Sequence, residues 1–317
     1  MTTNNQVINK AATGTTTTAT LAAGGKLNPE QARQFIQQTF EKTALGNLIR
    51  HVQREARAGE IDKIGIDRRI LRAKTENADD GYRAQPKHDK LTYSTTAVRL
   101  PWEITEEALR ENIEGQNYEN IVTNLMTTQL GIDREDLLIN GDTETPAKTG
   151  DDDTPDYDFL KINDGWVKQI KASGHTLDRS SVNSGAMTDG VFYDMLLAMP
   201  DKFQDNNLRW LMAPSRKTKW EKFLVEQART SGGAVTDGMI NNPAGHGIVT
   251  VPNFPADAIL LVNPQNLICV DTYNVIIRKT TEGVTAVMQD KRFYVVHFDY
   301  DPIVEEFDAT AIAYGLK

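Results

Sequence analysis

The chain has 317 residues, of which 39% are hydrophobic and 25% are charged, a composition typical of a soluble globular protein with a sizeable core. It carries 35 basic and 44 acidic side chains, and the formal net charge of −9 argues against general binding to nucleic-acid phosphates. The single cysteine, Cys269, excludes an intramolecular disulfide framework and any CxxC motif. No apolar run reaches the ~18 residues that span a bilayer, and the N-terminal residues lack a secretory pattern.

The first 54 residues predict an extended arm. Residues 1–27 are rich in Thr, Ala, Asn and Gly and contain too few apolar side chains to bury a core. Asn28, Pro29 and Glu30 are typical of a helix start, and an apolar stripe with helical spacing follows and stops before Gly46. The stripe consists of Ala32, Phe35, Ile36, Phe40 and Ala44. We expect its apolar face to need a partner surface.

Residues 60–100 predict two strands joined by a long polar loop. Ile64 and Ile66 alternate with polar residues, residues 91–98 are rich in β-branched side chains, and Asp80-Gly81 is a turn signal. Pro101 is expected to end the second strand. Because two-stranded hairpins are marginally stable alone, we expect this hairpin to lie on another subunit.

Two helices are predicted next. The first is short and runs from about Thr105 to Asn112. The second begins at a capping Asn117, runs to about Asn140 and stops at Gly141. Its apolar residues lie around much of its circumference, which predicts burial on more than one side.

The second half of the chain predicts a mixed α and β domain. An acidic loop at residues 150–158 is a natural boundary. Helices are expected at 159–171, 189–199 and 215–230, and a strand at 208–212. Seven further strands are expected at 248–251, 259–262, 267–270, 275–278, 284–288, 293–298 and 309–314.

Charge is distributed unevenly along the chain. From Arg50 to Leu100 twelve basic residues outnumber eight acidic ones, whereas residues 133–158 hold ten acidic residues and two basic ones. Either these segments are separate solvated surfaces, or they meet between copies of the chain, because complementary patches steer association and fix register.

The search for catalytic chemistry finds no nucleophile elbow, nucleotide-binding glycine motif or zinc-binding HExxH. Ser173, His175 and Asp178 share a short segment, but proximity in sequence does not make a triad. The acidic loop 151–158 departs from a calcium-binding loop, since Asp156 stands where the sixth-position Gly is needed. A metal-dependent hydrolase that uses this loop stays as the alternative from a different class. The four tryptophans, His297 and Cys269 are expected to serve in packing or strands.

The order of arm, long hairpin, short helix, long helix and strand-rich α+β domain resembles the tailed-phage major capsid proteins of the Hong Kong 97-type fold. The likeness is carried by Leu-Pro-Trp-Glu-Ile-Thr-Glu-Glu-Ala-Leu at 100–109, the helix at 117–141 ending in Asn-Gly-Asp, and Gly-Ile-Val-Thr-Val-Pro at 247–252, with the strands that follow through Asp301-Pro302. It covers nearly the whole chain and rests on order and pattern rather than on an invariant motif.

The resemblance implies an α+β Hong Kong 97-like fold with four parts. These are an N-terminal arm (1–54), an extended loop (55–100), a peripheral domain with the spine helix (101–158 and 280–306), and an axial domain (159–279 and 307–317). It implies a major capsid protein, not an enzyme and without cofactors, whose hexamers and pentamers form an icosahedral shell around double-stranded phage DNA. An encapsulin-like nanocompartment shell is the alternative with the same fold.

The implied partners are further copies of the chain, a separate scaffolding protein, a portal and cement proteins, with no membrane and no sequence-specific DNA contact. The implied location is the virion, after assembly in the host cytoplasm. Some relatives cross-link a loop Lys, here Lys63 or Lys74, to a peripheral Asn, but residues 288–292 contain no Asn, so we expect no cross-link.

We expect the basic hairpin to contact acidic surface of an adjacent subunit. The residues expected at contacts are Arg68, Arg69, Arg72 and Lys74 on the hairpin, Asp151, Asp152 and Asp153 on the acidic loop, and Gln289, Lys291 and Arg292 on the peripheral domain.

Overall fold

The computed structural model describes residues 45–66, 69–74, 76, 79, 81–111, 117–144, 156–272, 276–282 and 284–317. The predicted arm helix, Arg68, and Asp151, Asp152 and Asp153 lie outside these residues.

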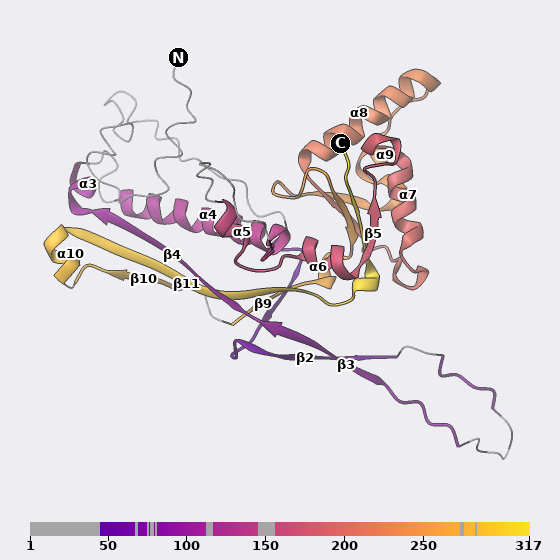
Figure 1. Ribbon diagram of the computed structural model, residues 1–317, viewed down its shortest axis with the longest axis horizontal. Helices are drawn as coiled ribbons and strands as arrows, with labels where there is room; N and C mark the ends of the chain where they lie inside the picture. Colours follow the sequence, from indigo (N-terminus) through magenta and orange to yellow (C-terminus); the bar gives the residue numbers. More distant parts are fainter. Residues whose placement is uncertain are drawn as a thin grey trace.

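The first sheet is organised by one long strand, β11 (Lys291–Val304). Residues 291–300 of β11 pair with β4 (Thr96–Thr105), and residues 300–304 pair with β9 (Leu267–Asp271). β10 (Ile276–Thr280) flanks the first part of β11, and β1 (Arg50–Gln53) pairs with β9 in parallel. The sheet therefore extends along the long axis of the molecule (Figure 1).

Two sequence predictions fail in this sheet. Pro101 does not end a strand but lies inside β4, opposite Val295. In the described residues β4 pairs only with β11, and such an edge strand accepts Pro because its missing N–H is not needed on the open side. Residues 284–288, predicted as a strand from their valines, form helix α10 (Val284–Gln289), which connects β10 to β11.

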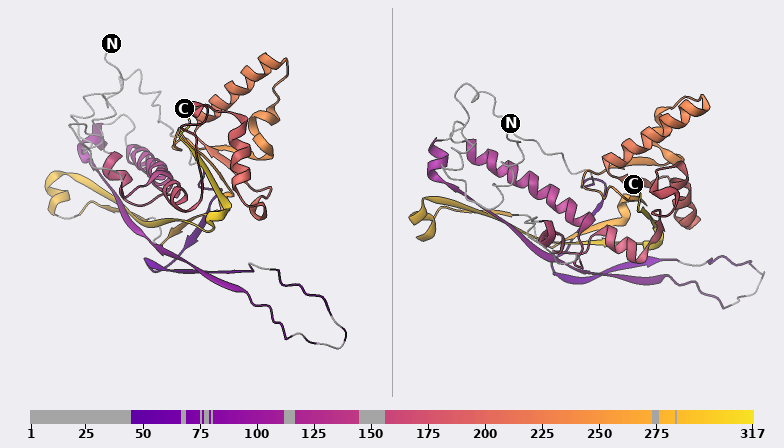
Figure 2. Two further views of the ribbon diagram at one scale, coloured as in Figure 1. Left: turned by 45° about the vertical axis from the view of Figure 1, so that its right-hand side comes forward. Right: turned by 45° about the horizontal axis from the view of Figure 1, so that its top comes forward.

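Helix α4 (Tyr118–Asn140) lies across one face of this sheet, and α3 (Glu106–Glu111) precedes it (Figures 1 and 2). Both helices were predicted, although the Asn117 side chain makes no capping hydrogen bond. The buried apolar residues of α4 belong to the same core cluster as Trp102 and Tyr294, which stack across β4 and β11 with ring centroids 5.2 Å apart. The buried residues of α4 include Val122, Leu137, Leu138 and Ile139.

The end of α4 is fixed by a close approach of two glycines. Gly165 donates its N–H to the Gly141 carbonyl at 2.8 Å. A Cβ on Gly141 would lie 2.4 Å from the Asn163 carbonyl oxygen, so no larger residue fits. Gly141 was predicted as the helix stop, and this contact adds a second reason for glycine there.

The second sheet has the strand order β5-β12-β8-β6-β7. These strands are β5 (His175–Asp178), β12 (Thr310–Tyr314), β8 (Ile259–Val262), β6 (Arg209–Met212) and β7 (Gly247–Thr250). The helices of this half are α5 (Asp156–Leu160), α6 (Trp166–Ser173), α7 (Asp189–Ala198), α8 (Pro214–Ser231) and α9 (Asp237–Asn241). Short 3-10 turns occupy Asn183–Gly185, Asp201–Phe203, Pro243–Gly245, Pro264–Asn266 and Phe307–Ala309.

The predicted helix at 159–171 is wrong as a single element, because the turn that brings Gly165 to Gly141 separates α5 from α6. The predicted packing roles of the aromatic residues and the cysteine are confirmed. The buried set comprises Trp102, Trp166, Trp210, Trp220 and Cys269.

The last element is the hairpin of β2 (Ala58–Gly65) and β3 (Lys87–Ser94). It projects beyond both sheets, and its described distal residues and α10 lie at opposite ends of the molecule (Figures 1 and 2).

Candidate intersubunit surfaces

The root of the hairpin packs on its own chain. Tyr93 is buried against Ile268, Val270 and Ile303 of the first sheet, and Ile61 joins the same cluster. The inward face of β2, at odd-numbered positions 59–63, is half-buried. The hairpin, which was expected to lie on another subunit, therefore packs on its own chain at its root, and contact of the rest with another subunit stays a prediction.

Carboxylates of β11 hold this root by polar contacts. Asp299 forms an ion pair with Arg57, Nε to Oδ2 2.8 Å, and Asp301 accepts a hydrogen bond from the Ser94 N–H at 2.8 Å. Successive side chains of a strand alternate between its faces, so residues 299 and 301 point to the same side, toward the hairpin. The Thr95 N–H also donates to the Arg57 carbonyl at 2.8 Å, which ties the two connections of the hairpin together.

Burial of Asp301 raises the pKa of its carboxyl to about 6, and the hydrogen bond from Ser94 opposes part of this rise. A carboxyl with a raised pKa binds its proton more readily in the folded chain than in the unfolded chain. Its contribution to stability is therefore fully present below the unfolded pKa of about 3.8 and is lost as the pH rises through about 6.

We expect Asp301→Asn to remove this pH dependence. Between pH 4 and pH 7 the free energy of unfolding of the wild type should fall relative to that of the variant by at most about 3 kcal/mol. We expect about half of that value, because the carboxyl keeps some contact with solvent. Urea denaturation at four pH values measures the difference, with the exposed Glu282→Gln as a matched control. A difference that stays constant with pH contradicts the assignment.

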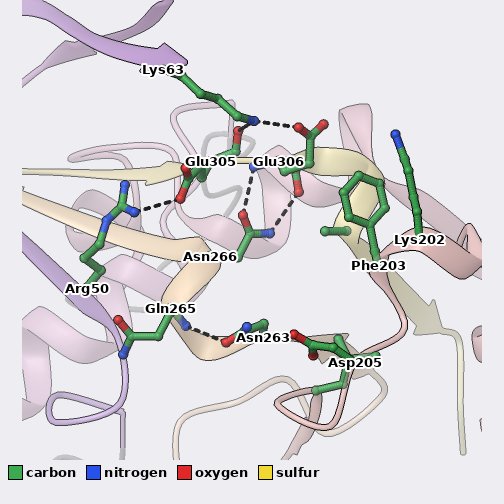
Figure 3. A pocket seen from close by; sticks show the side chains of 12 residues that line it. Arg50, Lys63, Lys202, Phe203, Asp205, Asn263, Gln265, Asn266, Glu305 and Glu306 are labelled. Carbon is green, nitrogen blue, oxygen red and sulfur yellow. Dashed lines mark hydrogen bonds and ion pairs between the residues drawn. The ribbon is translucent and has the colours of Figure 1, made fainter. Parts of the chain in front are cut away.

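Two consecutive glutamates that follow β11 connect its end to β1 and to the hairpin (Figure 3). Glu305 pairs with Arg50 of β1 at 2.8 Å, and Glu306 pairs with Lys63 of β2 at 2.6 Å. Asn266 fixes the backbone between them, because its side chain accepts from the Glu306 N–H and donates to the Glu306 carbonyl, both at 2.8 Å. These side chains line an open cavity of about 400 Å³ whose charges largely neutralise one another. The two ion pairs therefore connect the hairpin and β1 to the end of β11.

The distal part of the hairpin, residues 64–86, does not pack on its own chain as the root does. Among the described residues 64–86 no side chain is buried, and Leu71 is 93% exposed. Of the predicted contact residues, Arg69, Arg72 and Lys74 are exposed here, and the Arg72 guanidinium lies 3.9 Å from the centre of the Tyr82 ring. Exposed apolar side chains, Ile64 and Leu71 above all, therefore lie among the basic residues found from the sequence.

Fewer of the ten acidic residues at 133–158 are available to a neighbouring subunit than the sequence suggests. On α4, Glu135 is buried and accepts from the Leu45 N–H at 3.3 Å, and Asp136 accepts from the Asn140 amide at 2.6 Å. Burial also raises the pKa of Asp133. These three carboxylates lie in contacts of their own chain, Asp133 by accepting from the Gln129 amide at 2.6 Å. Asp142 and Glu144 both pair with Lys168, at 2.8 and 3.5 Å. The hairpin prediction therefore still applies chiefly to the acidic loop.

Two of the three predicted contact residues of the peripheral tip, Lys291 and Arg292, have partners in their own chain. Lys291 pairs with Glu103 at 3.2 Å, and Arg292 pairs with Glu119 at 2.6 Å and with Glu106. The hydrogen bond from Arg292 lowers the pKa of Glu106. Gln289 is exposed at the end of α10. Their role between subunits stays a prediction.

The triad considered from the sequence does not form a site, whereas the alternative of a metal site in the acidic loop 151–158 falls largely outside the described residues. His175 and Asp178 point to opposite faces of β5, and Asp178 accepts from the Ser180 N–H at 2.8 Å.

The donors His51, Cys269 and Asp271 do lie together, but Arg134 donates to the Cys269 sulfur at 3.0 Å and to Asp271. Burial raises the pKa of the Cys269 thiol to about 12. A neutral thiol beside a guanidinium does not fit a metal ion.

Among the described residues, no helix has both the length and the apolar character to cross a membrane.

No family model matches the chain. It is 27% identical over 328 residues to YqbE, a protein of Bacillus subtilis strain 168 named as a prophage capsid protein, and the match covers 97% of each. A chain of the satellite phage P4 procapsid that includes the size determination protein aligns with a TM-score of 0.60 and 18% identity, over 99% of this chain and 98% of that one. The SrpI encapsulin of Synechococcus elongatus PCC 7942 aligns with a TM-score of 0.56 and 13% identity, over 92% and 96%. The fold expected from the sequence is confirmed.

Proposed function

We propose that this chain, a phage-type capsid protein with the Hong Kong 97-type fold, assembles into hexamers and pentamers that close an icosahedral shell around double-stranded phage DNA. The observation that supports this most is the likeness to a prophage capsid protein over 97% of the chain. Among the described residues, the distal hairpin also exposes large apolar side chains such as Leu71. The role is structural, and the protein's place is the virion. We further propose that it has no enzymatic activity and assembles in the host cytoplasm.

The four-part division of the chain is also a proposal. Residues 1–54 form the arm, residues 55–100 the extended loop, residues 101–158 and 280–306 the peripheral domain, and the rest the axial domain. The pairing of β9 with β11 favours moving residues 267–279 to the peripheral side, because β9 lies in the sheet that carries α4.

In this proposal the hairpin reaches the neighbouring copy. The Glu305 and Glu306 junction and the β11 carboxylates hold its root, and the distal part lies on the adjacent subunit. Arg68, Arg69, Arg72 and Lys74 there face acidic surface, with Asp151, Asp152 and Asp153 as the first candidates, and the exposed Leu71 adds apolar burial. A scaffolding protein, a portal and cement proteins are the further partners.

We expect the double charge reversal Arg68→Glu with Arg69→Glu to block assembly, because it turns an attraction into a repulsion at each intersubunit contact. Sedimentation through a density gradient separates shells from free subunits. Lys219→Glu with Lys222→Glu, on the exposed side of α8, changes the charge equally and should leave assembly intact. Normal particles from the hairpin variant would show that these arginines do not hold the subunits together.

The acidic chain suits a container that must release its genome, since a strongly basic inner wall would retain DNA. The encapsulin-like alternative has the same fold but encloses protein instead of DNA. Particles purified from cells that express the chain with the other proteins of its virion distinguish the two, because a capsid protects double-stranded DNA from added nuclease. Particles that hold a protein cargo and no protected DNA would favour the nanocompartment.

A further inference from the structure

Strand β4 leaves one long edge of the first sheet open. Its ten residues, Thr96–Thr105, pair with β11 on one side, and among the described residues no strand pairs with the other side. Such an edge presents backbone N–H and C=O groups to any extended segment that approaches it. Val98, Trp102 and Ile104 favour an extended conformation, so β4 also has the composition of a segment that pairs readily.

The open edge is formed by the odd-numbered residues of β4. The Glu106 N–H, which continues the ladder beyond the end of β4, donates to the Asp290 carbonyl at 2.9 Å, on the side of β11. The Thr95 N–H instead donates to the Arg57 carbonyl, directly before β2, at 2.8 Å. Backbone groups of successive residues in an antiparallel strand point alternately toward and away from the partner strand. Pro101 therefore lies in the middle of the open edge.

Proline removes the central hydrogen-bond donor of this edge. Pro101 has no N–H, and its ring occupies the space into which an added strand would bring its own backbone. On the side of β11 the ladder runs without a gap from residue 96 to residue 105, so the proline takes no hydrogen bond from its own sheet. The side chain of Pro101 is exposed, as are those of Ala97 and Arg99, so burial does not explain a proline at this position.

Without the proline, this edge would match the same edge of a second copy. Two antiparallel strands related by a two-fold axis through residue 101 place Arg99 of each copy opposite Glu103 of the other. Opposite charges in directly opposed positions stabilise a strand pair. Glu103 is bound to Lys291 at 3.2 Å, but a carboxylate can accept several hydrogen bonds. The side chains therefore favour pairing between copies, and the backbone of residue 101 opposes it.

We propose that Pro101 keeps the open edge of β4 from pairing with the same edge of another copy of this chain. Association between copies is thereby left to other surfaces. This inference goes beyond the proposed shell function and does not depend on it, because the open edge belongs to the single subunit.

Replacing Pro101 by Thr tests the proposal. Pro101→Thr restores the N–H and introduces a residue that favours strands, so urea denaturation should give a free energy of unfolding no lower than that of the wild type. In sedimentation velocity of the chain expressed alone, a dimer should form at concentrations at least about ten-fold below those at which the wild type associates. Ala97→Thr, on the same edge, adds no N–H and should sediment as the wild type does.

A cysteine at position 101 tests the register. The one native cysteine, Cys269, is buried, so Pro101→Cys supplies a single exposed thiol. Two-fold pairing through residue 101 brings the two Cβ atoms to about 5 Å, and a short bismaleimide should link them into a covalent dimer. Ala97→Cys should stay unlinked, because residue 105 lies opposite residue 97 in this register.

Association of Pro101→Thr at wild-type concentrations, or the lack of a linked dimer from Pro101→Cys, would overturn the proposal. A clear loss of unfolding free energy in Pro101→Thr would also overturn it, because the proline would then serve the fold of its own subunit. A wild-type chain that forms no shells would contradict the proposed function and leave these results unaffected.

Discussion

Replacing residues 66–86 by the two-residue turn Asn-Gly should give a chain that folds but forms no shells. Gly65 and Lys87 are paired at the end of the β2–β3 ladder, and a two-residue turn of this type closes such a hairpin. The buried root around Tyr93 stays intact, so the loss in stability should be below about 1 kcal/mol. Assembly should be abolished, because the distal hairpin is the proposed connection to the adjacent subunit.

Urea denaturation and sedimentation velocity together check this result. The control replaces Arg229 and Ser231 at the exposed end of α8 by Ala and should assemble normally. Shells of normal size from the shortened chain would mean that the distal hairpin does not join subunits. Loss of folding would instead mean that residues 66–86 stabilise their own chain.

The largest loss of stability is expected for Gly141→Ala. The added Cβ would lie 2.4 Å from the Asn163 carbonyl oxygen and 2.7 Å from the Leu137 carbonyl oxygen, and backbone atoms cannot move aside as a flexible side chain does. We expect the free energy of unfolding to fall by about 3 kcal/mol, since the junction of α4 with the turn before α6 must open.

Gly190→Ala is the matched substitution for this test. A Cβ there meets only the Thr188 hydroxyl at 3.6 Å, near the start of α7, so stability should change by less than about 1 kcal/mol. Chemical denaturation of both variants gives the comparison. Equal stabilities of the two variants would contradict the close approach at Gly141.

The sequence predicts those helices and strands whose apolar spacing and end residues are clear within the element itself. α4, α7 and α8 follow helical apolar spacing with clear ends, and β8 is a purely apolar run bounded by turn residues. The failures arose where tertiary contacts outweigh local preference. Val284 and Val287 favour a strand in isolation, yet the connection between β10 and β11 is helical, and Pro101 is accepted because β4 is an edge strand.

The candidate surfaces were predicted only in part. The basic character of the hairpin is visible in the sequence, because its charges lie close together along the chain. The residues that anchor it are not, since Asp299, Glu305 and Glu306 follow their partners Arg57, Arg50 and Lys63 by more than two hundred residues. The sequence does show four acidic residues close together at 299–306. Only the fold shows that this segment contacts the hairpin.

The most direct test of the account is the mass of the purified wild-type chain, expressed with the other proteins of its virion, by sedimentation velocity and negative-stain microscopy. A subunit of 35.3 kDa that forms a shell should appear as closed particles of megadalton mass, accompanied by hexamers and pentamers. A stable monomer at every concentration and with every virion partner would contradict the claim that this chain builds a capsid.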